Sequence, residues 1–320
     1  MNEQKNIQYI QTTRDGFGLG LVQAAQLDPR VVGVCADLTE SVRMQWFRDQ
    51  FPDRFFEVGV AEQNLVGVAA GLALGGLIPF AASYACFSPA NSWGVIRTSV
   101  CYNNVPGKII GGHAGLVTGE DGATHQSLED IATMRVLPNM TVVVPCDGEE
   151  ARKATVALAA FDGSAYLRTS KYKVGALTNQ DSPFTIGVAN VLKEGEDVSI
   201  IGCGTILEIA LAAARELEEK GVSVRVVNMH TIKPLDVDRV RAAARETKHI
   251  FTLEDHQIIG GLGSAVAEVL ASLPSHAPLT RLGIDDRFGE SGSAHDLLEA
   301  YRLTPSHLVT AIQSALVTKS

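Results

Sequence analysis

Short apolar runs rich in β-branched residues alternate along this chain with segments of helical periodicity. The runs are apolar at consecutive positions rather than at every second one, which is typical of parallel strands covered by helices on both faces. The pattern therefore predicts an α/β fold with mostly parallel sheets flanked by helices. The predicted strands are residues 31–35, 56–60, 78–84, 108–112, 141–144, 165–168, 198–202, 222–227, 250–253 and 279–282.

The alternation lapses between Lys171 and Ser182, where the residues are typical of a linker. We therefore predict two α/β domains, residues 1–172 and 190–320, joined by a linker at residues 173–189. The predicted helices are residues 19–26, a helix that starts at Glu62, and residues 92–102, 127–135, 149–161, 207–217, 236–245 and 264–273.

Composition excludes several classes of protein. The 320 residues carry a formal charge of −9, which argues against a nucleic-acid-binding protein because that function needs a basic patch. The five cysteines lack Cys-x-x-Cys spacing, so we expect neither a disulfide framework nor a zinc site. The polar segment Met1–Lys5 has no apolar signal sequence, and with this cysteine usage it predicts a cytoplasmic protein.

The stretch from Gln63 to Ile96 has no charged residue and is long enough to suggest a membrane helix. However, Gly75, Gly76 and Pro79 break it into a short helix, a turn and a strand. We therefore predict that it is the buried core of an α/β protein and that the chain does not cross a membrane.

Glu62 is the one acidic residue in the first turn of the apolar helix that follows residues 56–60. The helix dipole lowers the pKa of a carboxyl group at this position, whereas burial against apolar neighbours raises it. A carboxyl group under both influences suits the sharing of a proton with a bound heteroaromatic ring. The alternative is an ordinary acid at the start of a helix.

Residues 111–126 form a glycine-rich loop after a predicted strand and contain His113, Asp121 and His125. Glycine allows positive φ angles and a close approach of backbone to ligand. Histidine can transfer protons near neutral pH, and the aspartate could bind a substrate hydroxyl. The loop is thus a candidate active-site loop, with an ordinary polar surface loop as the alternative.

Three glycine clusters, at residues 16–20, 202–204 and 260–263, do not match the G-x-G-x-x-G or P-loop patterns of nucleotide sites. We interpret them as turns at helix starts. Arg14, Arg168 and Lys171 are single cations at the ends of predicted elements, where solvation is the ordinary state, although arginine is suited to phosphate.

Several motifs in the same order resemble the C-terminal half of transketolase, and more distantly the deoxyxylulose phosphate synthases. The resemblance covers nearly the whole chain and implies a pyrimidine-binding domain followed by a transketolase C-terminal domain. The motifs are Thr13-Arg14, Ala36–Thr39, Gly59–Gln63, Gly119–Gln126, Leu167–Ser170, Thr231–Asp236 and Leu253–His256.

The resemblance implies thiamine diphosphate as cofactor and the transfer of a two-carbon ketol unit from a ketose to an aldose. It places Glu62 on the N1′ nitrogen of the pyrimidine ring, where sharing a proton activates the cofactor. Phe87 matches the aromatic residue that stacks on this ring, and Trp93 matches another aromatic residue of the pocket. Ala90 replaces a usual aromatic residue, and Asp37 matches an acid near the cofactor and the subunit interface.

The resemblance also implies a sugar-phosphate substrate. His113 and His125 match histidines that contact the substrate and transfer protons, and Asp121 matches the acid that binds a sugar hydroxyl. The residues that match contacts to the substrate phosphate are Arg14, Ser41, His113 and Arg168.

In transketolase, a magnesium or calcium ion is held by a Gly-Asp-Gly segment with a downstream asparagine, in a preceding N-terminal domain. The Asp-Gly pairs of this chain lack that frame, so we expect no metal site on it. The resemblance therefore implies one subunit of a split transketolase, active only with a separate diphosphate-binding subunit in an α2β2 assembly.

Two other hypotheses remain open. The chain could be the β subunit of a 2-oxoacid dehydrogenase-type thiamine enzyme, which would decarboxylate its substrate. It could also be a non-catalytic assembly module of the same fold.

Overall fold

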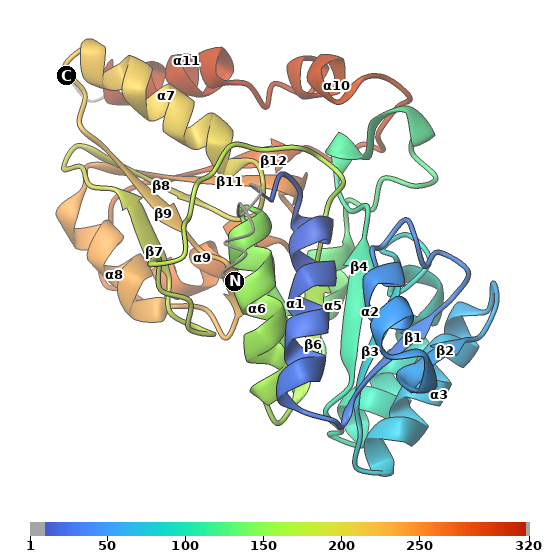
Figure 1. Ribbon diagram of the computed structural model, residues 1–320. Coiled ribbons are helices and arrows are strands. Elements are labelled where there is room, and N and C mark those ends of the chain that lie inside the picture. Colours follow the sequence, from blue (N-terminus) through green and yellow to red (C-terminus); the bar gives the residue numbers. More distant parts are fainter. Residues whose placement is uncertain (1–9, 318–320) are drawn as a thin grey trace, which may run out of the picture.

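The computed structural model describes residues 10–317, so the predicted absence of a signal sequence at Met1–Lys5 lies outside the described residues. The chain forms two α/β units side by side, each a sheet with its flanking helices, which we call the first and the second layer (Figure 1). The first contains a seven-stranded sheet of order β10-β5-β6-β4-β3-β1-β2, in which only β10 is antiparallel to its neighbour. Its strands are β1 (Val31–Cys35), β2 (Phe55–Glu57), β3 (Ile78–Tyr84), β4 (Lys108–Gly112), β5 (Met140–Val143), β6 (Ser164–Arg168) and β10 (Thr231–Lys233).

The second layer contains a five-stranded sheet of order β12-β11-β8-β9-β7, with only β7 antiparallel. Its strands are β7 (Asn190–Lys193), β8 (Val198–Gly202), β9 (Val224–Asn228), β11 (His249–Gln257) and β12 (Leu279–Ile284). The predicted fold of two mostly parallel sheets flanked by helices is confirmed. The short strand β10 belongs to the first sheet although it follows β9 in sequence.

Helices cover both faces of the first sheet. Successive residues of a strand point to opposite sides, so alternate residues pack against different helices. Phe80 and Ala82 of β3 pack in the core with α1 and α6, whereas Ala81 packs with α3 and α5. The α-helices are α1 (Thr13–Leu27), α2 (Gln45–Gln50), α3 (Glu62–Leu74), α4 (Trp93–Val95), α5 (Asp130–Arg135), α6 (Gly148–Ala160), α7 (Leu207–Glu219), α8 (Val237–Glu246), α9 (Leu262–Leu270), α10 (Ala294–Ala300) and α11 (Pro305–Val317).

Helices α1 and α6 lie side by side in close contact (Figure 1). A Cβ atom on Gly16 would lie 2.0 Å from the carbonyl oxygen of Gly148, and one on Gly20 would lie 2.7 Å from Arg152. The interpretation of residues 16–20 as a turn at a helix start is therefore wrong. Helix α1 already begins at Thr13, and these glycines allow two helices to touch.

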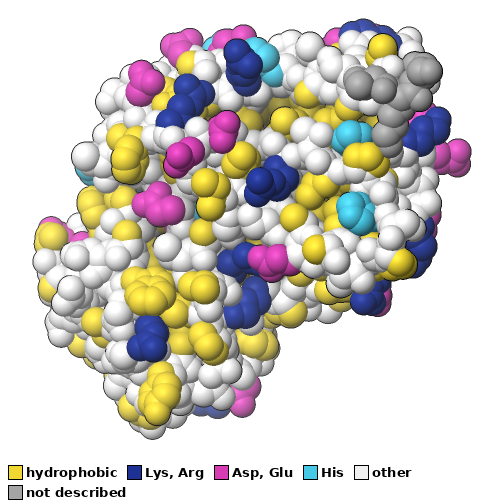
Figure 2. All heavy atoms as spheres, turned by 180° about the vertical axis from the view of Figure 1, so that it is seen from behind, with side chains coloured by type: hydrophobic (Ala, Val, Ile, Leu, Met, Phe, Trp, Pro, Cys, Tyr) yellow, Lys and Arg dark blue, Asp and Glu magenta, His cyan; other side chains and the backbone are white. Residues whose placement is uncertain are grey.

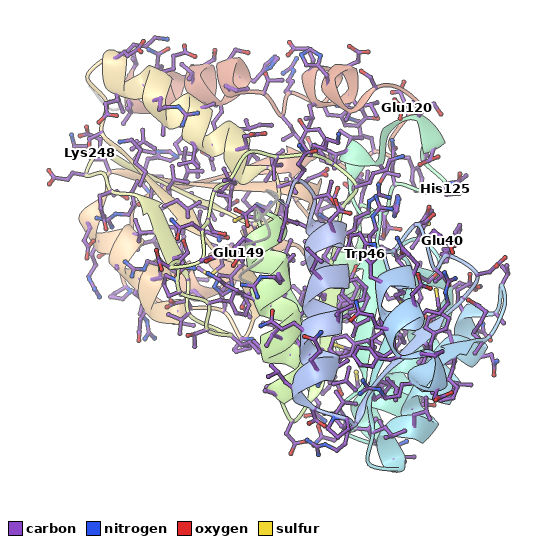
Figure 3. All side chains as sticks on the ribbon, in the orientation of Figure 1. Glu40, Trp46, Glu120, His125, Glu149 and Lys248 are labelled. Carbon is purple, nitrogen blue, oxygen red and sulfur yellow. The ribbon has the colours of Figure 1, made fainter. Side chains whose placement is uncertain are left out.

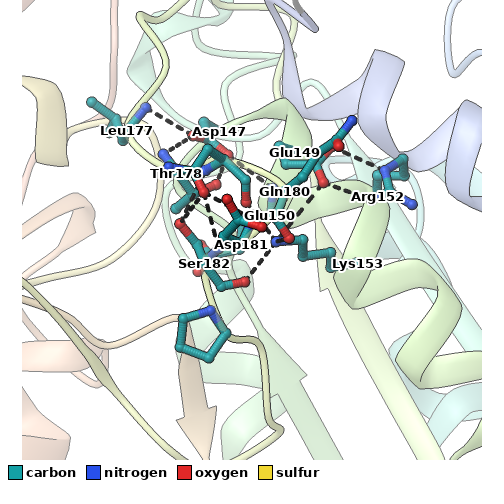
Figure 4. A network of polar contacts seen from close by, with 12 residues as sticks. Asp147, Glu149, Glu150, Arg152, Lys153, Leu177, Thr178, Gln180, Asp181 and Ser182 are labelled. Carbon is teal, nitrogen blue, oxygen red and sulfur yellow. Dashed lines mark hydrogen bonds and ion pairs between the residues drawn. The ribbon is translucent and has the colours of Figure 1, made fainter. Parts of the chain in front are cut away.

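The predicted linker is held firmly on α6 (Figure 4). The Asp147 carboxylate caps the helix through the Glu150 amide and also accepts hydrogen bonds from the amides of Leu177 and Thr178. The Lys153 ammonium group donates to three backbone carbonyl groups of residues 179–182. This segment therefore has a defined path over the first layer.

Strands β1, β3, β4 and β8 have the predicted bounds, and most other elements differ by a few residues. The larger differences are α1, which starts earlier than predicted, and the predicted helix 92–102, which is α4 followed by a π-helical segment η3 (Ile96–Tyr102). The elements without a sequence prediction are α2, β7, β10, α10 and α11. Within residues 10–317, no helix combines the length and apolarity needed to cross a bilayer.

Candidate active site

Polar and aromatic side chains gather at the carboxyl ends of β1, β3, β4 and β6, which are neighbours in the first sheet. The chain passes from β1 to β2 on one side and returns to β3 on the other, so β1 pairs with both. Open α/β sheets bind ligands at such a reversal point, beyond the carboxyl ends of the strands. This edge of the sheet is therefore the candidate active site.

His113, directly after β4, lies at the centre of this edge. Its Nε2 atom is 3.3 Å from Nη1 of Arg14, and the same Arg14 nitrogen donates to the Ser41 carbonyl oxygen at 3.1 Å. Burial, together with the charges of Arg14 and Lys171, lowers the pKa of His113 to about 3. The imidazole is therefore neutral near pH 7, and the buried Nδ1 atom has no hydrogen-bond partner among the described residues.

An aromatic cluster joins His113 to the other predicted residues. The ring of Tyr84, at the end of β3, stacks on His113 with centroids 4.0 Å apart and on Phe87 with centroids 5.8 Å apart. His125 meets Phe87 edge-on at 5.4 Å. Three predicted residues are thus brought together by Tyr84, which the sequence analysis did not identify as a site residue because it ends an apolar strand.

The site loop, residues 113–126, contains the 3₁₀ segment η4 (Leu116–Asp121). Asp121 is exposed and its carboxylate accepts a hydrogen bond from the Lys171 ammonium group at 2.8 Å, which lowers the pKa of Asp121. Figure 3 shows Glu120 and His125 along the outer edge of the molecule. The loop thus holds a carboxylate and two imidazoles, and the ammonium group of Lys171 lies against the carboxylate.

Glu62 is the first residue of α3 and is 8% exposed. Within residues 10–317 its carboxylate forms no hydrogen bond or ion pair, so capping does not explain its burial. The neighbouring residue Gln63 donates to the Asn91 carbonyl oxygen at 3.2 Å, which ties the start of α3 to the turn that follows Phe87. Burial raises the pKa of the nearby Cys86 thiol to about 12, with the charges of Glu62 and Asp121 acting in the same direction.

Arg168, by contrast, is locked inside the protein. Its Nε atom donates to the Asp130 carboxylate at 2.8 Å, and Nη2 donates to the carbonyl oxygens of Asp255 at 2.8 Å and Ser127 at 3.3 Å. Only 7% of the residue is exposed. These bonds occupy Nε and Nη2, so the phosphate contact by Arg168 stays a prediction. Lys171, three residues later, donates to the Asp121 carboxylate in the site loop.

Two further predicted residues lie apart from the histidine cluster. The Trp93 indole N–H donates to the Thr133 carbonyl oxygen at 2.9 Å, and its ring packs on the core beneath α3. Asp37 is exposed after β1 with a φ of 57°, and its amide donates to the Glu57 carboxylate at 2.8 Å. Among residues 10–317, no group of three or more His, Cys, Asp or Glu side chains could hold a metal ion.

Comparison with known protein families shows which family the chain belongs to. The model of the transketolase pyrimidine binding domain matches residues 10–175, and that of the transketolase C-terminal domain matches residues 187–308. The chain belongs to the transketolase family. The predicted resemblance is confirmed.

Individual transketolase relatives match over nearly their full length. A Methanocaldococcus jannaschii protein named as a transketolase C-terminal section is 40% identical over 305 residues, 95% of this chain and 96% of that protein. A 6-deoxy-6-sulfo-D-fructose transketolase subunit from Clostridium sp. strain MSTE9 is 39% identical and covers 93% of this chain and 92% of its own length. The solved structure of a split-gene transketolase, an inactive β4 tetramer, has 43% identity and a TM-score of 0.90, covering 97% of this chain and 99% of that one.

The transketolase family is thiamine-dependent, and the residues present here suit the pyrimidine side of thiamine diphosphate. Glu62 is a largely buried residue whose carboxylate has no protein partner in the described chain, so it is available to pair with a ring nitrogen. Phe87 presents a half-buried aromatic ring beside His125.

Proposed function

We propose that this chain is the pyrimidine-side subunit of a split transketolase, which transfers a two-carbon ketol unit between sugars. The observation that carries the proposal is Glu62, a largely buried residue whose carboxylate has no partner within residues 10–317, near an edge that holds Arg14, His113 and Lys171. Thiamine diphosphate, when bound, supplies carbanion chemistry at a carbonyl carbon. The protein must then hold a proton at the pyrimidine ring and orient a sugar.

Each residue has a distinct task in this proposal. Glu62 would hold the proton at the ring nitrogen, and Phe87 would pack against the ring. The neutral imidazole of His113, oriented by Arg14 and Tyr84, would hydrogen-bond a substrate oxygen without adding positive charge. His125 is the candidate for moving a proton to or from the sugar, because it lies on the accessible loop.

An anionic sugar suits the cations of the site. Lys171 and Arg14 both act electrostatically on His113, and among the described residues Lys171 is paired only with the exposed carboxylate of Asp121. A phosphate or sulfonate could replace or share that carboxylate contact. Lys171 therefore joins Arg168 in our hypothesis for binding the substrate anion, while Ser41 and Asp121 remain candidates for contacts to the sugar.

The site needs a second chain, and α3 offers a surface for one. Its outward positions are Gln63, Asn64, Gly67, Gly71 and Leu74, all uncharged, and a Cβ atom on Gly67 or Gly71 would meet nothing within 4 Å. Hydrophobic side chains gather at this end of the molecule in Figure 2, at the lower left. We propose that the diphosphate-binding subunit, with its magnesium or calcium ion, covers Glu62 from this side in an α2β2 assembly.

The test is reconstitution with the partner subunit. We expect no ketol transfer by either chain alone, and transfer that depends on thiamine diphosphate after mixing. Sugar phosphates, sugar sulfonates and neutral ketoses should be compared as donors. Release of carbon dioxide from a 2-oxoacid without ketol transfer would instead support the dehydrogenase hypothesis, and no thiamine diphosphate uptake by the mixture would support a non-catalytic module.

A further inference from the structure

A buried carboxylate of the second layer, that of Asp255, reaches into the candidate active site. Asp255, near the end of β11, accepts a hydrogen bond from the Leu116 amide at 2.8 Å and lies 3.5 Å from the Val117 amide. These amides open η4, the central segment of the site loop. Two residues from the first layer are therefore fixed by a side chain that belongs to the other sheet.

The backbone of the site loop is shaped to receive this carboxylate. Gly115 has a φ of 93°, and a Cβ atom there would lie 2.1 Å from Oδ2 of Asp255 and 3.3 Å from Nη2 of Arg168. A side chain at position 115 would occupy the space that the carboxylate needs. The close approach therefore depends on glycine for both its conformation and its size.

A hydrogen bond links the capped segment of the loop to His113. Thr118, which follows the two capped amides, donates its hydroxyl to the His113 carbonyl oxygen. That bond fixes the His113 backbone, whose φ of 52° is unusual for a residue with a side chain. The imidazole then lies against Tyr84 and Arg14.

Arg168 fixes the backbone of Asp255. Its guanidinium group binds the Asp255 carbonyl oxygen and the Asp130 carboxylate, and the Tyr166 hydroxyl donates to Asp130 at 2.6 Å. The far end of the loop is also tied to the second layer, because the Gln126 amide group donates to the carbonyl oxygen of Glu290 at 2.9 Å.

We propose that Asp255 is a positioning residue that sets the site loop, and through it His113, from the second layer. The role in turnover rests on the proposed ketol transfer, whereas the effect on the loop does not. The buried carboxylate caps the loop amides, and Arg168 holds the backbone of Asp255 through its carbonyl oxygen. The second layer thus contributes to substrate orientation without touching the substrate.

The test compares Asp255→Asn with Asp236→Asn in the full chain. Asp236 is a matched control, because its carboxylate also accepts two backbone amides and caps a helix of the same layer, α8, away from the site. We expect amide hydrogen exchange in residues 113–126 to become about tenfold faster in Asp255→Asn, since an uncharged side chain caps the amides less well. Exchange of this loop should be unchanged in Asp236→Asn.

In the reconstituted complex, we expect Asp255→Asn to lower kcat/KM for the sugar by about tenfold while thiamine diphosphate affinity stays as in the wild type. Asp255→Glu provides a second variant that keeps the charge facing Arg168 but displaces the carboxylate, and its loop should also exchange faster. Unchanged exchange of residues 113–126 in both variants, or equal losses of kcat/KM in Asp255→Asn and Asp236→Asn, would overturn the proposal. If the wild-type complex shows no ketol transfer, the proposed function fails and the exchange data still decide the role of Asp255.

Discussion

The carboxyl ends of the two sheets carry polar side chains in both layers, yet they serve different purposes. In the seven-stranded sheet, His113, Phe87 and Lys171 border a partly open edge. In the five-stranded sheet the corresponding side chains face the first layer and are buried, and we call them sealed. Asn228 donates to the Glu150 carboxylate at 2.8 Å, and Glu254, Asp255 and His256 are inaccessible to solvent or nearly so. The same architecture thus forms a partly open site at one sheet and a buried contact between the layers at the other, depending on whether the polar side chains are covered by the protein.

The strongest test of this contrast is Glu62, the unpartnered acid at the open edge. Glu62→Gln should lower kcat of the reconstituted complex by about 10²–10⁴-fold, because a group that shares a proton in the reaction contributes that much. The free energy of unfolding should change by about 1 kcal/mol or less, as expected at a helix start. Steady-state kinetics and urea unfolding measure both quantities.

Glu120→Gln is the matched control, because Glu120 is an exposed acid on the site loop. It should retain nearly full kcat. A Glu62→Gln complex with wild-type turnover would show that the open edge is not used as we propose.

Arg168 tests the sealed side of the contrast. Arg168→Met should lower the free energy of unfolding by about 3–5 kcal/mol, because it leaves the buried carboxylate of Asp130 without its cationic partner and with only the Tyr166 hydroxyl. Arg48→Met removes only exposed pairs with Glu40 and Asp49 and should cost about 1 kcal/mol or less. If thermal or urea unfolding gave similar losses for both variants, the buried network would not stabilise the contact between the layers.

Replacing Lys171 should affect activity and not stability, the reverse of the effect expected for Arg168. Lys171→Met should leave stability nearly unchanged and lower kcat/KM for an anionic sugar by about 10–100-fold, the effect of losing one charge-assisted hydrogen bond. A neutral sugar should be affected much less. Lys173→Met, an exposed lysine two residues away, is the control, and equal effects on charged and neutral substrates would contradict the assignment.

The smallest expected effect is a change in how the free energy of unfolding depends on pH when Glu254 is replaced. Burial raises the pKa of Glu254 to about 7, so the folded protein holds this proton over a range in which the unfolded chain, with a pKa near 4.5, has lost it. This group therefore makes the protein less stable as pH rises from about 4.5 to 7. In Glu254→Gln that loss is absent.

The difference in unfolding free energy, variant minus wild type, should therefore rise by about 1 kcal/mol or more across this range. Exposed Glu219→Gln should show no such trend. A flat difference for Glu254→Gln would mean that the sealed carboxyl group is more accessible to water than its burial indicates.

The sequence predicted the fold well because the central strands are short and mostly apolar, as in β1. It missed β10, whose three residues pair with a distant strand, and α2, which has only six residues. Neither carries enough periodicity to stand out from its surroundings.

The site was predicted in part. His113, Phe87 and His125 do come together, and the loop composition and the family resemblance pointed to them. The burial of Arg168 could not be foreseen, because its partner Asp255 lies 87 residues away. The pKa of His113 near 3 likewise depends on packing that spacing does not reveal, so the expectation of proton transfer near neutral pH applies poorly to this residue.

Strand β10 has a practical consequence for anyone dissecting the molecule. It completes the outer edge of the seven-stranded sheet by pairing with β5, and its Lys233 binds the carbonyl oxygens of Arg135 and Leu137. A fragment cut between residues 175 and 187, where the two family models separate, would leave β5 with bare backbone donors and acceptors. Such a fragment should self-associate, so the evolutionary modules of this chain are not independent folding units.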